Sequence, residues 1–379
     1  MKRVVLVLMA WCAVAGAQEV RRALPVTAEA KPDEVAKFLA GVPLPEGAAL
    51  AVLQKDPAYA EHVKDLARLT RHYDKTYFSK MRAWSAAELA PRIAMNRPVY
   101  YFFGGPDAVS PLALFPEAPV YVLGGLESVG SIAAPQTLTP EARAEGLANL
   151  RQSADVILSY GHFITKDMKA ELDRTAFRGV LPLIYTFIAL TGGEVARAEC
   201  VGVRRDGSLA VVPGEAAGML PGVKVTFRRA PGAAEQVLYY VQANVADDAL
   251  KANSSVLTWT GGFGPGNVYL KAASYLMHEP YFSRIRSFLL TKGEAVLQDD
   301  SGIPFRYFQD GNWRCWLFGK YSGTLDIFKQ YHQPDLAGFF ASPGAAVELP
   351  FGTGYKWRQG ESNLMLAVRQ RVPRAAPAR

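Results

Sequence analysis

The sequence predicts an α/β or α+β fold, with helices that alternate with short buried strands in the N-terminal half. The C-terminal half is expected to contain an antiparallel β meander and mixed α/β structure. Short apolar runs alternate with amphipathic helical segments up to about residue 193. Beyond that point, apolar and polar residues alternate along runs that end in turn sequences. Hydrophobic residues make up 50% of the 379 positions and charged residues 20%. This globular composition excludes a collagen or a coiled coil.

The N-terminus has the features of a secretory signal peptide, residues 1–17. Lys2 and Arg3 precede an uninterrupted apolar run, Val4 to Val14, and a small-x-small cleavage pattern follows it. This run is much shorter than the ~20 residues that span a bilayer. We therefore expect cleavage and export of a soluble chain to the periplasm or the medium, with a retained anchor as the alternative. No later run is long enough to span a membrane.

Residues 34–193 are expected to form an α/β part, after a polar linker over residues 18–33. Asp56 and Pro57 have the order of a helix N-cap and a first turn, and apolar residues then recur every three to four positions as far as Trp84. Two further helices are expected, one beginning at Thr139 and one from Thr165 to about Arg174. Three apolar runs suit buried strands, although the third could equally be a buried helix: Val99–Phe103, Val120–Leu123 and Leu183–Leu190.

Residues 194–368 are expected to form a β-rich α+β part. Val195–Val245 is interpreted as a β meander, because Asp206-Gly207 is a hairpin turn sequence and Val223–Arg228 alternates in polarity. Asn267–Met277 suits a helix. Residues 369–379 alternate arginine with proline and alanine, which predicts a basic disordered tail.

Net charge and cysteine content limit the partners of the chain. The formal charge is +7, but part of it lies in the signal peptide and the tail, and we expect no nucleic-acid partner. Two cysteines, Cys200 and Cys315, remain after cleavage. In an oxidising compartment they could form a disulfide, and two buried thiols are the alternative. Such widely spaced cysteines do not indicate a zinc site.

The common catalytic and cofactor motifs are missing from the sequence. There is no HExxH, no GxxxxGK[ST] and no SxxK, and the nearest approach to GxSxG, around Ser128, has one residue too many. The histidines are scattered without metal-ligand spacing. The sequence therefore predicts no metal and no cofactor, apart from a calcium ion that carboxylates alone could hold.

One positive pattern is a glycine pair at the end of each of four apolar runs. Acidic residues follow three of the pairs, namely Asp107, Glu127 and Glu194. If the runs are parallel strands, the pairs lie at the carboxyl ends of the strands, where open α/β sheets bind ligands. Carboxylates gathered there could perform acid–base chemistry or hold a polar ligand. The four pairs are Gly104-Gly105, Gly124-Gly125, Gly192-Gly193 and Gly261-Gly262.

Each of these site assignments has a structural alternative. Glycines also simply end strands, and Asp107 could cap the turn after Pro106. His162 could carry protons at the same edge or, more simply, cap a helix C-terminus. The dense C-terminal aromatics, with Asp299 and Asp300 nearby, could stack on sugar rings or pack in the core.

Three functions remain compatible with the sequence. The first is binding of a small polar ligand or glycan at the glycine-rich loops. The second is a carboxylate-dependent hydrolase with a glycan-type substrate, which uses two of the three acids Asp107, Glu127 and Glu194. The third is a non-catalytic interaction protein of the cell envelope.

Overall fold

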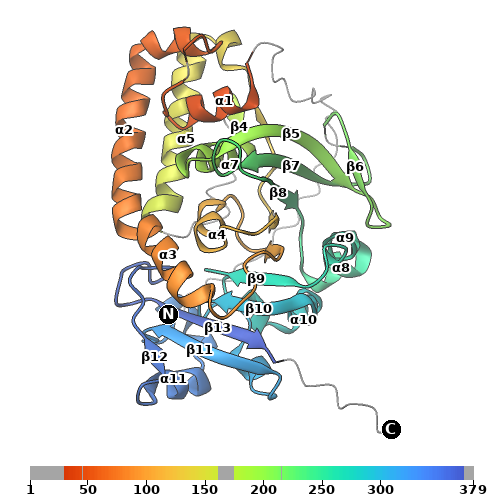
Figure 1. The fold of residues 1–379 in the computed structure, drawn as a ribbon. Helices are drawn as coiled ribbons and strands as arrows, with labels where there is room; N and C mark the ends of the chain where they lie inside the picture. The colour runs from red at the N-terminus through yellow and green to blue at the C-terminus, as the bar shows by residue number, and fades with distance from the viewer. Residues whose placement is uncertain (1–29, 45, 161–174, 215, 371–379) are drawn as a thin grey trace, which may run out of the picture.

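The computed structural model describes residues 30–44, 46–160, 175–214 and 216–370 (Figure 1). The predicted signal peptide, the helix expected from Thr165, His162 and nearly all of the basic tail lie outside the described residues. Within the described ranges, no helix is long and apolar enough to cross a membrane.

An 11-stranded sheet forms the centre of the fold, in the order β12-β11-β13-β10-β9-β1-β2-β8-β7-β5-β6. Its five central strands are parallel. In chain order they are β1 (Val99–Tyr101), β2 (Val120–Gly125), β8 (Glu235–Gln242), β9 (Gly266–Leu270) and β10 (Gly293–Gln298). From β1 the chain adds β2 and β8 on one side, then crosses to add β9 and β10 on the other. The boundary between β1 and β9 is therefore the topological switch point of the sheet.

Antiparallel strands flank the parallel core on both sides. The predicted meander is confirmed: β8 pairs with β7 (Leu220–Arg228), β7 with β5 (Glu194–Val203), and β5 with β6 (Leu209–Val211). On the other side, β10 pairs with β13 (Asn363–Arg369) and β13 with β11 (Trp313–Gly319). The short β12 (Ala346–Val347), which is parallel to β11, ends this flank. β3 (Ser131–Ile132) and β4 (Phe177–Arg178) form a separate antiparallel pair.

Helices cover both faces of the sheet, as the predicted α/β or α+β class requires (Figure 1). One face carries α1 (Pro32–Leu39), α2 (Pro57–Tyr73), α3 (Ser79–Trp84), α4 (Val109–Leu114), α5 (Pro140–Tyr160) and α7 (Leu181–Leu190). The other carries α8 (Asp247–Ala252), α9 (Ser255–Gly261), α10 (Ser283–Lys292) and α11 (Pro334–Ala341). Neighbouring strand residues enter opposite cores, for example Tyr101 the first and Tyr100 the second. This alternation follows from the two-residue period of a strand.

Local signals in the sequence explain several of these elements. Asp56 caps α2 as predicted, because its carboxylate accepts a hydrogen bond from the Ala58 backbone N–H at 2.9 Å. A π-helical turn, Asp74–Phe78, joins α2 to α3, and a second one, Ser85–Leu89, extends the helical segment beyond Trp84. The run Leu183–Leu190 lies in α7, so the helical alternative for it is correct. The linker expected over residues 18–33 ends two residues earlier than predicted, because α1 begins at Pro32.

Two predictions in the C-terminal half are wrong. Asn267–Met277 is not a helix, because its first residues form β9, whose five residues are all buried. The cysteines form no disulfide. Cys200 lies in β5 and Cys315 in β11, the tenth and second strands in the sheet order. With about 4.8 Å between strands, eight spacings separate these thiols by roughly 38 Å, whereas the Cα atoms of a disulfide lie within about 7 Å.

Candidate functional site

The glycine pairs and the acids that follow them lie at two opposite edges of the sheet. Gly104-Gly105 and Asp107 follow β1, and Gly124-Gly125 ends β2 just before Glu127. These residues lie at the carboxyl edge of the parallel strands, as predicted. The hydrogen bond from the Gly105 N–H to the Gly124 carbonyl, at 3.2 Å, joins the two loops.

The other two pairs lie at the amino edge, so the prediction of one shared edge is wrong for them. Glu194 begins β5 and pairs with Arg228, which pairs with Glu235 at the start of β8. Gly192-Gly193 therefore lies at the amino edge, as does Gly261-Gly262, which ends α9 and precedes β9. The prediction failed because the apolar runs before both pairs are helices, and a helix returns the chain to the amino edge.

Packing within the protein explains the glycines at the carboxyl edge. A Cβ atom on Gly125 would lie 2.9 Å from the Gly105 Cα and 2.9 Å from the Tyr240 hydroxyl. A Cβ atom on Gly104 would lie 2.3 Å from the Tyr101 ring. The glycines thus allow neighbouring loops and rings of the same chain to approach closely. This favours the structural alternative over direct ligand binding at these residues.

Gly125→Ala is therefore expected to lower the unfolding temperature. The added methyl group would overpack a buried contact between backbones, which typically costs about 1–3 kcal/mol. Gly261→Ala is the matched control, because a Cβ there would make only ordinary contacts, with the end of the Lys292 side chain at 3.4 Å and the Phe288 ring at 3.7 Å. Thermal unfolding of both variants checks this result. Equal melting temperatures for the two variants would contradict the packing explanation.

Asp107 forms the centre of a buried polar cluster at the switch point. Its side chain is 2% exposed and lies 2.6 Å from the ammonium group of Lys271, which is 6% exposed and follows β9. The Tyr101 hydroxyl donates to the same carboxylate at 3.0 Å, and the Ser110 backbone N–H donates at 3.1 Å. Lys271 also donates to the Ser110 hydroxyl at 3.0 Å. Asp107 therefore caps the first turn of α4, as in the structural alternative, and neutralises a buried cation.

Glu127 is likewise engaged inside the protein. It is 1% exposed, and the Tyr240 hydroxyl donates to its backbone carbonyl at 2.8 Å and to its carboxylate at 3.3 Å. Asp107 and Glu127 thus share the carboxyl edge, but both carboxylates take part in internal contacts.

The loop after β9 is strained. Ala272, Ser274 and Tyr275 have φ angles of 49°, 53° and 54°, a region that residues other than glycine rarely adopt. The backbone N–H groups of Ala272, Ala273 and Ser274 donate to Asp299, Ser301 and Tyr355 at 2.8, 2.7 and 3.1 Å. Such conformations persist only where surrounding contacts impose them, and they concentrate at functional sites. The sequence contains no signal for this loop.

Two adjacent acids after β10 hold the strained loop in place. Burial, and next the charge of Asp300, raise the pKa of Asp299 to about 7. Burial also raises the pKa of Asp300, although hydrogen bonds from Tyr275 and Asn363 oppose the shift. The Tyr275 hydroxyl donates to Asp300 at 2.5 Å and the Asn363 amide at 2.9 Å.

A pocket of about 310 Å³ opens beside these loops. We call it the carboxyl-edge pocket. Gln333 connects it to the acids, because its amide donates to the Asp300 backbone carbonyl at 2.9 Å. The half-buried Tyr331 ring stacks on Tyr275 with 5.2 Å between centroids, and its hydroxyl donates to Glu279. The polar residues that line the pocket include His278, Glu279, Arg306, Tyr331, His332 and Asp335.

His278 lines this pocket, and one of its ring nitrogens lies just beneath the surface. Its Nε2 atom is buried and has no hydrogen-bond partner among the residues that the structure describes. The ring bonds the backbone carbonyl of Asp300, and since Nε2 has no partner, Nδ1 makes this bond as the donor. Burial, and next the charges of Arg306 and Arg286, lower the pKa of His278 to about 4. The ring is therefore neutral at pH 7, and Nε2 carries a lone pair.

The C-terminal aromatics named by the sequence are largely core residues. Phe305, Phe308, Trp313, Phe318 and Tyr321 are buried, which supports the packing alternative for them. Tyr331, Tyr275 and His278 were not singled out from the sequence, because they come from separate loops. Within the described ranges, no group of three or more His, Cys, Asp or Glu residues could hold a metal ion.

Comparisons with known proteins identify no relative of the chain. No protein-family model, no curated protein and no solved structure matches the chain significantly.

Proposed function

We propose that the protein binds a small polyhydroxylated ligand, such as a sugar or another polyol, in the carboxyl-edge pocket. The position supports this, because open α/β sheets bind ligands outside the carboxyl ends of their strands, near the switch point. The volume of about 310 Å³ lies at the lower end of the range for small-molecule sites, roughly 300–1,000 Å³.

The observation that carries the proposal is the Nε2 atom of His278. A buried acceptor that lacks a donor costs about 1–3 kcal/mol. We propose that pocket side chains shift to let a ligand hydroxyl reach Nε2, which would remove that cost. Glu279 and Asp335 add carboxylate acceptors, and Arg306 adds a donor. Groups of both kinds suit a ligand with several hydroxyls, because each hydroxyl both donates and accepts.

The other functions have less support from the described residues. The hydrolase requires two acids in one cleft, but Asp107 is paired with Lys271, and Glu194 lies at the opposite edge. An interaction surface requires a contiguous apolar patch, whereas the large exposed apolar side chains come from separate elements, for example Val52, Val211 and Ile327. Export stays a prediction that rests on residues 1–17.

A titration with D-glucose, D-galactose, N-acetylglucosamine and myo-inositol tests the proposal. At least one of them is expected to raise the unfolding temperature and to give saturable heat in calorimetry. In His278→Asn, the amide can still donate to the Asp300 carbonyl, but the acceptor at Nε2 is lost. Loss of one neutral hydrogen bond should weaken binding about five- to tenfold.

His278→Gln is the matched control, because its longer amide can present an oxygen near the Nε2 position. It should keep more affinity than His278→Asn. Binding of equal strength to both variants would contradict the role of Nε2. If none of the four compounds binds the native protein, the proposed ligand class is wrong.

A further inference from the structure

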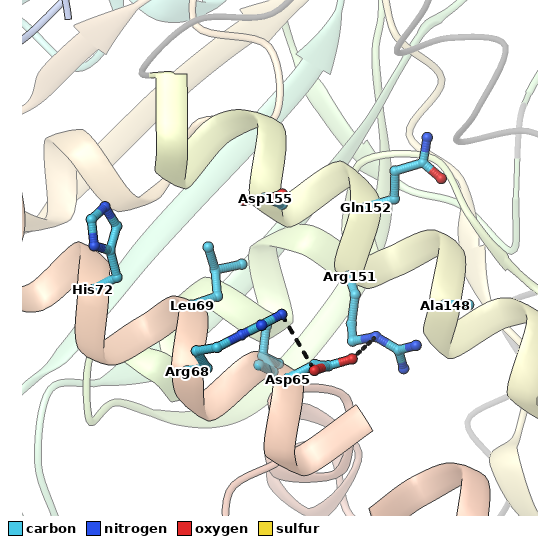
Figure 2. A pocket seen from close by; sticks show the side chains of 9 residues that line it. Asp65, Arg68, Leu69, His72, Ala148, Arg151, Gln152 and Asp155 are labelled. Carbon is cyan, nitrogen blue, oxygen red and sulfur yellow. Dashed lines mark hydrogen bonds and ion pairs between the residues drawn. The ribbon is translucent and has the colours of Figure 1, made fainter. Parts of the chain in front are cut away.

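A second cavity lies far from the carboxyl-edge pocket in the fold, between α2 and α5. Its volume is about 600 Å³, and both helices contribute side chains to it (Figure 2). We call it the α2–α5 cleft. Arg143 pairs with Asp56 and Arg151 with Asp65, so the two helices run in the same direction.

The cleft has an apolar wall and a positively charged end. Leu66, which is 1% exposed, lines it together with Leu69 and Ala148. At one end, the guanidinium groups of Arg68 and Arg151 both face the carboxylate of Asp65 (Figure 2). Two cations share one anion, so this end has a net charge of about +1.

Neither arginine is fully satisfied by Asp65. The Arg68 Nη2 atom lies 3.4 Å from one carboxylate oxygen, and the Arg151 Nε atom lies 3.9 Å from the other. Charge-assisted hydrogen bonds are usually shorter, about 2.7–2.9 Å. Both guanidinium groups therefore keep donors for a further oxyanion, which arginine binds in a planar, two-pronged geometry.

A buried histidine positions one of these guanidinium groups. His62 is 0% exposed, and its Nε2 atom lies 2.9 Å from the Leu39 carbonyl, to which it must donate. Nδ1 therefore accepts from the Arg151 Nη1 atom, at 3.3 Å. Burial lowers the pKa of His62 to about 4, so the ring is neutral at pH 7. His62 orients Arg151 without neutralising its charge.

A negatively charged side chain lies farther along the cleft. Asp155 lines it one helical turn beyond Arg151 (Figure 2), which is about 6 Å along the axis. Its carboxylate accepts a bond from the Ser159 hydroxyl at 2.5 Å. A second negative charge on a ligand would meet Asp155, so the cleft favours a ligand with a single anionic group.

From these contacts we infer that the α2–α5 cleft binds a small organic monocarboxylate with an apolar body. The carboxylate lies against Arg68 and Arg151, and the carbon chain covers Leu66 and Leu69. This site is independent of the carboxyl-edge pocket and of the ligand proposed there.

Calorimetric titration of the full chain with sodium hexanoate at pH 7 tests this site, with disodium adipate as the dianionic comparison. Hexanoate is expected to bind with saturation, and adipate at least about tenfold more weakly because of Asp155. Arg151→Gln should weaken hexanoate binding about tenfold or more, as expected for a lost charge-assisted bond. Arg68→Gln should weaken it about two- to fivefold, because solvent screens an exposed ion pair.

Two further variants make the result decisive. The Arg68 side chain is 79% exposed, so Arg68→Gln keeps the fold even if Arg151→Gln disturbs His62. Arg71→Gln removes an exposed arginine of α2 that does not line the cleft and should leave the affinity unchanged. Asp155→Asn should bring adipate close to hexanoate. Absence of hexanoate binding, or equal affinity in Arg68→Gln and Arg71→Gln, would overturn the inference.

Discussion

Lys271→Met is expected to lower the free energy of unfolding by about 3–5 kcal/mol, the usual cost of leaving one member of a buried ion pair alone. Asp107 would then be a carboxylate that is 2% exposed and has lost its cation at 2.6 Å. The bonds from Tyr101 and the Ser110 N–H would remain, but neither supplies a positive charge. Urea unfolding monitored by circular dichroism at pH 7 measures the loss.

The double variant Lys271→Met with Asp107→Asn separates the ion pair from simple packing. If the cost comes from an unpaired buried charge, removing that charge should recover more than half of the lost stability. If the double variant lost as much stability as the two single variants added together, this explanation would be contradicted. Asp107→Ala alone should also destabilise the protein, because it removes both the cap of α4 and the partner of Lys271.

Local signals made the elements predictable, whereas long-range pairing did not. Asp56 before Pro57 predicted the start of α2, and Asp206-Gly207 predicted the β5–β6 turn, because each signal acts within a few residues. The strand order depends on which distant segments pair. The sequence did not identify β9 as a strand, because β9 is buried on both faces. Its residues therefore do not alternate in polarity as those of a half-exposed strand do.

The candidate site was predicted only in part, because its contacts join segments that are distant in the sequence. The carboxyl edge was the correct place for Asp107 and Glu127, since each follows a parallel strand within a few residues. Their actual partners, such as Lys271, come from loops that are distant in the sequence and meet only after the sheet has formed. The lone pair of His278 depends on which ring nitrogen bonds Asp300, and no sequence pattern contains that information.

The stability of Asp299→Asn relative to the native protein is expected to rise with pH. The pKa of Asp299 is about 7 in the fold against 3.8 as its ordinary value. A raised pKa in an acid means that its contribution to stability is fully present below about pH 4 and is lost as pH rises through 7. Between pH 5 and pH 8 only the part of this loss from pH 5 to about 7 is sampled, which corresponds to about 3 kcal/mol. The asparagine variant, which cannot ionise, avoids this loss.

Urea unfolding of both proteins at pH 5 and pH 8 measures this difference, since every other titrating group is common to the two chains. Asp247→Asn is a control whose stability relative to the native protein should not change between pH 5 and pH 8. Burial opposes ionisation of Asp247, but bonds from the Ser283 hydroxyl and the Arg284 N–H outweigh burial and lower its pKa. A lowered pKa stabilises the fold at every pH above the ordinary value of 3.8, so the stability of this variant relative to the native protein should be the same at pH 5 and pH 8. If the Asp299→Asn difference were independent of pH, Asp299 would already be ionised at pH 5, and the strained β9 loop would be held by a permanent carboxylate.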